Sequence, residues 1–389
     1  MRTMHPVLKR GGLYWDQSLL PPEAYKERFA RIQSAIVESG DDAWLFYGDV
    51  ERYGAVAWFS NFLPRTRAAL AFVPREGEPV LLLAVGLRDV PAAKTLTWVD
   101  DVRPYSNLPR SLAALIEEKG LAKGRIGLAG VEELLPVKHW NDFNAAMPGL
   151  KLADRAQNLA PLRARKAACE IAAIRAAATI VRRALDNIGA EIRAGRKMRE
   201  VTAVIDRQCR VAAAEDVRVM VASGEQTGQS LRPGDDRMLQ NGDVIQIYLA
   251  VEAQRYWAEG ARTFVIGKAG DAIRAAHARA NAAMRVMQMA FRSEVTGSEI
   301  ASAGLATLGD AELMKSAGGY GLGNGVGLDA DEFPRIEVGS PDMIADHSTL
   351  ALRLIGHANG TGIALAETLL WSGGKVESLT GATTLTECN

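Results

Sequence analysis

The sequence predicts an α+β protein of two domains, with a smaller α/β domain preceding a larger domain of long helices and paired strands. The chain has 389 residues, more than a single hydrophobic core usually supports. An amphipathic helical pattern at residues 22–39 is followed by short apolar runs, among them AWLFYG and PVLLLA, which alternate with helical spacing. A turn-rich segment then places the domain boundary near residue 155. We therefore expect domains at residues 1–155 and 156–389.

The larger domain is expected to combine alanine-rich helices with neighbouring strands. Residues 166–189 have a helical pattern that ends at a glycine, as helices commonly do. Residues 242–267 contain two apolar runs joined by a polar segment, which predicts a hairpin or a meander. The last quarter contains a Gly-rich loop and two or three strands. Further helices are expected at residues 198–214, 270–290 and 296–308.

The composition excludes several classes of protein. Lys plus Arg and Asp plus Glu both number 46, so the formal net charge is zero and no basic surface for nucleic acid or an anionic membrane is indicated. Cys169, Cys209 and Cys388 are far apart and form no CxxC pair, so neither a disulfide framework nor a thiolate zinc site is expected. The chain has no apolar signal segment at its start and no apolar run long enough to span a membrane. A cytoplasmic protein is expected.

Four segments resemble motifs of one known family. In chain order they are RARKAACEIAAIRAA, NGDVIQIYLAVEAQRYWAEGARTF, GYGLGNGVGLDADEFP and ALAETLLWSGGKVESLT. Together they resemble the creatinase, prolidase and aminopeptidase P family over nearly the whole chain. The resemblance implies a pita-bread C-terminal domain after a smaller creatinase-type N-terminal domain. It also implies a homodimer in which the N-terminal domain of the partner lies near the active site.

The metal positions of that family are changed in this chain. Metal-using members bind two divalent ions through two Asp, one His and two Glu, which suit such ions as anionic oxygen and imidazole ligands. In this sequence the resemblance places Tyr248, Glu259, Asn324, Arg353 and Glu367 at these positions. Arginine stays protonated in proteins, so it replaces a metal charge and does not ligate a metal. We therefore expect no metal and no other cofactor.

The same positions supply the candidate catalytic residues. The resemblance implies that their side chains project into one cavity, where titratable groups of both signs favour acid-base chemistry. A carboxylate could act as a general base or a nucleophile, and the phenol as a proton donor. The alternative is a structural ion pair between Arg353 and one of the carboxylates. The candidates are Glu259, Glu367, Tyr248, Arg353 and His357.

Other polar residues are candidates for substrate binding. Arginines suit carboxylates because their donors match both oxygens, so the arginines among them favour a small anionic substrate. Surface or interface arginines and solvated loop acids are the alternative interpretation. The candidates are Asn324, Asp331, Glu332, Arg335, Arg65 and Arg67.

These expectations combine into a functional hypothesis. We expect a metal-independent, creatinase-like hydrolase of a C–N bond, in an amide, amidine or ureido group of a small anionic metabolite. Two further family histidines fall on Leu231 (or Ser230) and Asp331, so neither the creatinase mechanism nor the peptidase mechanism transfers intact. The alternatives are a metal-independent lyase or isomerase, an Xaa-Pro-type metallopeptidase with unusual ligands, and a non-catalytic binding protein of the same fold.

Overall fold

The computed structural model describes residues 15–64, 67–131, 134–228, 230–319, 321–358, 360–381 and 384–389. The chain divides into two compact units, Met1–Arg163 and Ala164–Asn389. The domain boundary expected after residue 155 lies at the start of helix α6 (Ala156–Ala164), and the division between the units falls at the end of the same helix.

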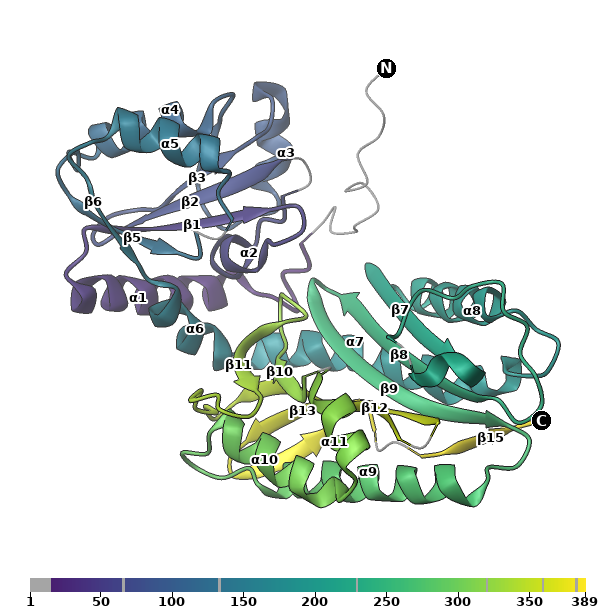
Figure 1. Cartoon of the computed structure of the whole chain (residues 1–389). Helices are drawn as coiled ribbons and strands as arrows, with labels where there is room; N and C mark the ends of the chain where they lie inside the picture. The colour runs from purple at the N-terminus through teal and green to yellow at the C-terminus, as the bar shows by residue number, and fades with distance from the viewer. Residues whose placement is uncertain are drawn as a thin grey trace. The chain divides into compact units, whose positions relative to one another are not determined.

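The first unit is built on a mixed sheet of six strands in the order β4-β3-β2-β1-β5-β6 (Figure 1). Strand β2 runs antiparallel to β1 and β3, and the other neighbours are parallel. The predicted first helix is confirmed, and it ends where Gly40 adopts a left-handed conformation with φ of 68°. The elements are α1 (Pro22–Ser39), β1 (Ala43–Asp49), α2 (Gly54–Ser60), β2 (Ala68–Pro74), β3 (Val80–Leu83), η2 (Leu87–Asp89), α3 (Val90–Lys94), β4 (Asp101–Pro104), α4 (Leu108–Glu118), β5 (Arg125–Ala129), α5 (Val137–Ala146) and β6 (Lys151–Asp154).

The second unit contains a sheet of nine strands with the central order β11-β10-β12-β13-β9-β8-β7. Strand β14 pairs with β13, and β15 runs parallel to β9. The elements are α7 (Ala168–Asn187), η3 (Ile188–Glu191), α8 (Met198–Val211), β7 (Asp216–Ser223), η4 (Gly224–Gly228), β8 (Val244–Ala253), β9 (Tyr256–Ile266), α9 (Asp271–Met289), α10 (Gly297–Leu308), α11 (Ala311–Gly319), β10 (Gly323–Gly325), β11 (Glu332–Ile336), β12 (Ser348–Ala358), β13 (Thr361–Ser372), β14 (Lys375–Ser378) and β15 (Thr386–Cys388).

The predicted helices of this unit are present, although α7 ends at Asn187 and Gly189 lies in the following turn η3. Helix α10 begins after Thr296, whose side chain accepts a hydrogen bond from the backbone N–H of Glu299. The Glu299 carboxylate in turn accepts from the backbone N–H of Thr296, so the two residues form a capping box. The predicted hairpin is also present, as the antiparallel pair β8 and β9.

The helices of the second unit pack against one face of its sheet, here called the helix face (Figure 1). One buried cluster joins α7 and α8 to β7, β8 and β9, and another joins α9, α10 and α11 to β12 and β13. Successive side chains of a strand point to opposite faces, so in β8 Ile247 and Leu249 join the helix-face core while Tyr248 points the other way. The face that carries Tyr248 is called the polar face.

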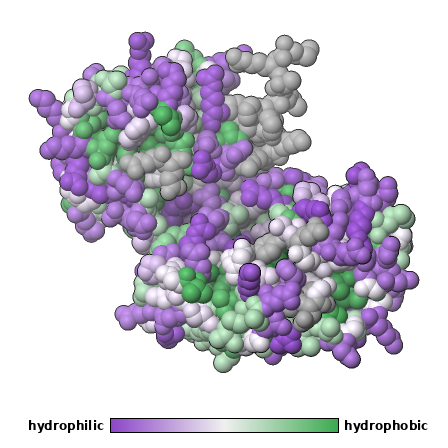
Figure 2. Space-filling view, in the orientation of Figure 1, coloured by the Kyte–Doolittle hydropathy of each residue, from purple (hydrophilic) through white to green (hydrophobic). Residues whose placement is uncertain are grey.

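The surface is that of a folded chain with its apolar residues mainly inside. In the view of Figure 2, hydrophilic residues dominate the visible surface and apolar residues form separate patches. Among the described residues, no helix combines the length and the apolar character needed to cross a membrane.

Candidate active site

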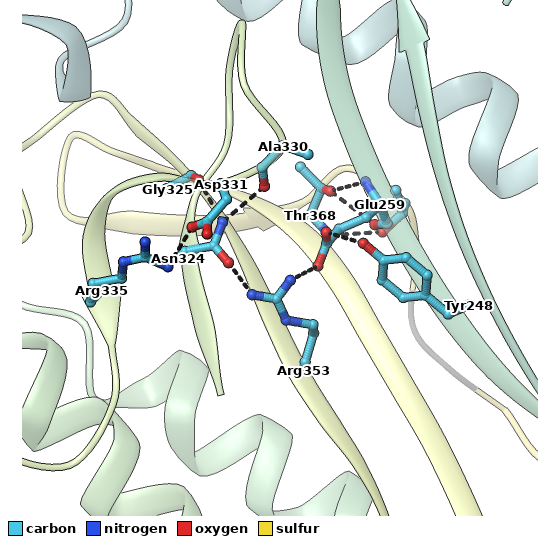
Figure 3. Close-up of polar contacts among 10 residues, drawn as sticks. Tyr248, Glu259, Asn324, Gly325, Ala330, Asp331, Arg335, Arg353 and Thr368 are labelled. Carbon is cyan, nitrogen blue, oxygen red and sulfur yellow. Dashed lines mark hydrogen bonds and ion pairs between the residues drawn. The ribbon is translucent and has the colours of Figure 1, made fainter. Parts of the chain in front are cut away.

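Strand register gathers side chains from distant parts of the chain on the polar face. Ala261 of β9 pairs with Tyr248 of β8 and with Ala366 of β13, and Ala366 pairs with Arg353 of β12. Residues in register share a face, and so do residues two apart on one strand, which places Glu259 beside them. Figure 3 shows Tyr248, Glu259 and Arg353 pointing toward one another.

Glu259 lies at the centre of this cluster and is almost completely buried. The Tyr248 hydroxyl donates a hydrogen bond of 2.6 Å to its Oε2, and Nη1 of Arg353 donates one of 2.8 Å to its Oε1. The Glu259 backbone N–H donates to Oγ1 of Thr368 (2.8 Å), which donates to the Glu259 carbonyl (2.9 Å). Both the carboxylate and the backbone of Glu259 are therefore held in place.

Asn324 joins the cluster from strand β10, in the Gly-rich segment. Its Nδ2 donates to the carbonyl oxygens of Gly325 (2.7 Å) and Ala330 (3.0 Å), which fixes the orientation of the amide (Figure 3). Its Oδ1 consequently faces Arg353 and accepts a hydrogen bond from Nη2. The guanidinium thus bridges Glu259 and Asn324.

Burial and charge fix the protonation states of the cluster. Burial acts to lower the pKa of Arg353, but the negative charge of Glu259 acts together with Tyr248 and Asp331 to outweigh it, and the pKa is raised above its ordinary value. Burial, together with the charge of Glu259, raises the pKa of Tyr248 well above 10. The guanidinium is therefore charged and the phenol is neutral at physiological pH.

Replacing Tyr248 with phenylalanine is expected to reduce the loss of stability at alkaline pH. The pKa of Tyr248 is raised in the folded state. Its contribution to the free energy of unfolding is therefore fully present below pH 10 and is lost as the pH rises above that value, where the unfolded chain releases the proton. Unfolding by guanidinium chloride at pH values from about 8 to about 11 measures the stability of both proteins. Tyr47 and Tyr105, whose pKa values are also raised by burial, are common to both proteins and cancel in the comparison. Equal slopes of stability against pH would contradict the assignment.

This donor set does not fit the two-metal centre that the family resemblance implies. The cluster offers one carboxylate, and both its oxygens already accept hydrogen bonds from a phenol and a guanidinium. Across the described ranges, no group of three or more His, Cys, Asp or Glu side chains could hold a metal ion. A fixed positive charge at Arg353 also opposes a divalent cation at this place.

The expectation that Glu367 shares the cavity is wrong. In β13 it pairs with Leu352 and Gly260, so it lies on the helix face. There its Oε2 accepts hydrogen bonds from Oγ of Ser378 (2.5 Å) and Nε2 of Gln288 (3.3 Å). The residue that faces Arg353 is Ala366, one position earlier. A shift of one residue along a strand exchanges its faces, which explains the error.

His357 is not brought into contact with the cluster. It lies at the far end of β12, where its backbone N–H donates to Oγ of Ser316 and its Nε2 is 3.8 Å from a carboxylate oxygen of Glu312. It shares the polar face with Arg353, four residues earlier, but no contact with Tyr248 or Glu259 supports a catalytic role.

The loop acids have separate roles. Asp331 and Arg335 form an exposed ion pair of 2.6 Å, and the charge of Asp331 contributes to the raised pKa of Arg353. Glu332 is buried and accepts a hydrogen bond of 2.6 Å from Nζ of Lys166. Glu332 therefore anchors the loop, and the structure does not support the expected contact between its carboxylate and a substrate.

The two N-terminal arginines remain predictions as substrate ligands. Arg67 is exposed in the first unit, with φ of 60°, and Arg65 lies outside the described residues.

Sequence reasoning missed three residues of the polar face. Thr368 anchors Glu259, as described above. The guanidinium carbon of Arg218 lies 4.3 Å from the centre of the Trp257 ring, a cation–π arrangement. Arg218 is in register with Ala250, which is in register with Glu259, so the arginine lies on the same face. The alternation of β7, β9 and β13 could have assigned these residues to the polar face, although not the contact between Arg218 and Trp257.

Comparison with known proteins identifies relatives of both units. Residues 172–370 match metallopeptidase family M24, and residues 28–165 match the creatinase/prolidase N-terminal domain. An Xaa-Pro dipeptidase of Pyrococcus horikoshii is 26% identical over 238 residues, which cover 59% of this chain and 66% of that protein. An Xaa-Pro dipeptidase of Pyrococcus furiosus is 25% identical over 219 residues, which cover 54% of this chain and 60% of that protein. The alignments thus span slightly less than two thirds of these relatives.

Solved structures show the same fold. An X-Pro aminopeptidase from Thermotoga maritima superimposes with a TM-score of 0.81 at 23% identity, covering 92% of this chain and 99% of that one. The dipeptidase PepE from Mycobacterium ulcerans superimposes with a TM-score of 0.83 at 20% identity, covering 94% of this chain and 98% of that one. The predicted α+β class, a pita-bread domain after a creatinase-type N-terminal domain, is confirmed.

The comparisons also correct the functional hypothesis. A metal-independent, creatinase-like hydrolase of a small anionic metabolite was expected, whereas the relatives are Xaa-Pro dipeptidases and the matched family is one of metallopeptidases. The hypothesis is contradicted, and the alternative of an Xaa-Pro-type peptidase is favoured.

Proposed function

Because the chain belongs to metallopeptidase family M24, we propose that it hydrolyses the peptide C–N bond of short Xaa-Pro peptides. The two Xaa-Pro dipeptidase relatives support this substrate class. The observation that carries the proposal is the buried Glu259 carboxylate, held between Tyr248 and Arg353 on the polar face. The cluster therefore places a base (Glu259), a neutral proton donor (Tyr248) and a fixed positive charge (Arg353) next to one another.

These groups match the steps of amide hydrolysis. Glu259 takes a proton from water as the water oxygen bonds to the scissile carbonyl carbon. The carbonyl oxygen then carries negative charge, which the Arg353 guanidinium stabilises from a buried position. Collapse of this intermediate breaks the C–N bond, and the proton that the leaving nitrogen needs comes from Tyr248, which Glu259 reprotonates. No step is assigned to a divalent ion because the donor set does not fit one.

The test is an assay with Ala-Pro and Leu-Pro, with mass spectrometry of both products. We expect equal amounts of proline and of the N-terminal amino acid, and release by a Glu259→Gln variant that is slower by roughly 10²-fold or more. The assay is run with added Mn²⁺, Co²⁺ or Zn²⁺ and with a chelator. Absence of proline release under all of these conditions would overturn the proposal. The homodimer implied by the family resemblance stays a prediction, to be measured by sedimentation.

Arg218 is expected to bind the free carboxylate of such a substrate. Its guanidinium is about half exposed, is fixed over Trp257 and lies on the same face as Glu259. A hydrogen bond to a charged group contributes about 1.5–3 kcal/mol, so Arg218→Met should raise KM for Leu-Pro roughly tenfold or more. KM for Leu-Pro amide, which lacks the carboxylate, should hardly change.

Arg175→Met is the matched control, because Arg175 lies on α7 and pairs with Glu377 at the surface. The control should leave KM unchanged for both substrates. Equal effects of Arg218→Met on the acid and the amide would argue against a contact with the carboxylate.

A further inference from the structure

Strands β9 and β13 are neighbours near the middle of the nine-stranded sheet, but their direct pairing is short. Within the described part of the chain, the ladder between them consists of two pairs, Ala366 with Ala261 and Glu367 with Gly260. The antiparallel register places Thr368 opposite Glu259, one step beyond this ladder. The proposed base therefore lies where the two strands begin to separate.

The backbone of β13 changes its partner at Thr368. The N–H and the carbonyl of Glu259 both face β13, so in a regular ladder they would bond to the backbone of Thr368. Instead, the Thr368 N–H donates to Oγ1 of Thr380 (3.0 Å), and its carbonyl accepts from the N–H of Leu379 (2.8 Å). Strand β14 pairs with β13 directly beyond this point. The backbone of Thr368 is thus not available to Glu259.

The side chain of Thr368 takes the place of the missing backbone pair. Its Oγ1 accepts a hydrogen bond from the N–H of Glu259 (2.8 Å) and donates one to the Glu259 carbonyl (2.9 Å), as Figure 3 shows. One hydroxyl therefore satisfies both backbone groups of Glu259. Because buried backbone groups need a hydrogen-bond partner, the position of Glu259 in β9 depends on this hydroxyl.

The opposite end of the ladder contains the same arrangement without a catalytic group. There Thr263 of β9 lies opposite Ala364 of β13, and its Oγ1 accepts from the N–H of Ala364 (2.7 Å) and donates to the carbonyl of Ala364 (3.2 Å). Thr263 and Thr368 are both fully buried. The bridged residues differ, since Ala364 has no polar side chain and Glu259 carries the carboxylate of the cluster. If both hydroxyls were only structural, their removal would have equivalent effects.

We propose that Thr368 is a positioning residue for the hydrolysis proposed above, on which this inference rests. Its hydroxyl holds the backbone of Glu259 where β9 and β13 separate, and so keeps the carboxylate within hydrogen-bond distance of Tyr248 and Arg353. Thr368 acts through Glu259 and does not contact the substrate. Misplacement of a catalytic group by about 1 Å can slow a reaction on the order of 10²-fold. Loss of the hydroxyl therefore lowers kcat and leaves KM unchanged.

Steady-state kinetics with Leu-Pro compares Thr368→Val, which keeps the shape of threonine but lacks the hydroxyl, with the matched control Thr263→Val. We expect Thr368→Val to lower kcat roughly 10-fold or more with KM within about twofold, and Thr263→Val to leave both within about twofold. Thr368→Ser restores the hydroxyl and should bring kcat to within about threefold of the unmodified protein. Circular dichroism shows whether each variant is folded.

Three kinetic results would overturn the proposal. They are an equal loss of kcat in Thr263→Val, a rise in KM without a fall in kcat in Thr368→Val, and a Thr368→Ser variant as slow as Thr368→Val.

A double-mutant cycle tests the positioning without turnover, so failure of the proposed hydrolysis is distinguished from failure of this inference. Tyr248→Phe removes the hydrogen bond between the phenol and Glu259. It should lower the midpoint of unfolding by guanidinium chloride at most about half as much in the Thr368→Val background as in the Thr263→Val background. Equal midpoint shifts would overturn the proposal, whether or not the unmodified protein hydrolyses Leu-Pro. Unequal shifts in a protein that does not hydrolyse Leu-Pro would overturn the proposed function and support the positioning of Glu259 by Thr368.

Discussion

Arg353→Met is expected to lower the free energy of unfolding by about 3–5 kcal/mol, because it leaves the buried Glu259 carboxylate without its cationic partner. The methionine side chain keeps an unbranched apolar stem but supplies no charge and no donor. The substitution also removes the hydrogen bond to Asn324, whose amide is fixed by two carbonyl groups. Guanidinium unfolding at neutral pH, followed by tryptophan fluorescence, measures the change.

The double variant Glu259→Gln/Arg353→Met separates loss of an ion pair from loss of packing. Without either charge, no unpaired ion is buried, so the double variant should be more stable than Arg353→Met alone. An exposed ion pair stabilises a protein by about 1 kcal/mol or less. If Arg353→Met lowered the free energy of unfolding by no more than this, the Arg353–Glu259 pair would not behave as a buried ion pair.

Glu259→Gln is expected to have the largest effect on catalysis. The amide keeps the size of the carboxylate but cannot accept a proton from water, so kcat for Leu-Pro should fall roughly 10²-fold to 10⁴-fold. KM should change little, since the substrate contacts proposed at Arg218 are intact. Steady-state kinetics with circular dichroism of the variant distinguishes lost chemistry from lost folding.

His357→Gln is the control for this experiment. His357 was expected to be catalytic, but its contacts are with Ser316 and Glu312 and not with the cluster. Its replacement should leave kcat within about twofold of the unmodified protein. If instead His357→Gln abolished turnover and Glu259→Gln did not, the assignment of the base would be wrong.

The sequence predicted most of the fold because local patterns determine it. The two apolar runs in residues 242–267, joined by a polar segment, predicted a hairpin or a meander, and the hairpin β8–β9 is present; helical spacing predicted α1, α7, α8, α9 and α10. Tyr248, Glu259, Asn324 and Arg353 were predicted as one cluster from their motif positions, and the structure brings these four together.

Contacts that depend on register or on distant segments could not be predicted in the same way. Glu367 was assigned to the wrong face, because a motif match does not fix the alternation of a strand to within one residue. The Lys166–Glu332 pair joins side chains that are far apart in sequence, so nothing local indicates it. Arg218 acquires its position from Trp257 on another strand, and no spacing rule connects the two.

In β13 the side chains of Ala366 and Thr368 point to the polar face and that of Glu367, between them, points to the helix face. Insertion of a single amino acid just before Ala366 would exchange the faces to which these side chains point. A second acid would then stand beside the guanidinium, and the threonine that ties down the hairpin would be turned toward α9.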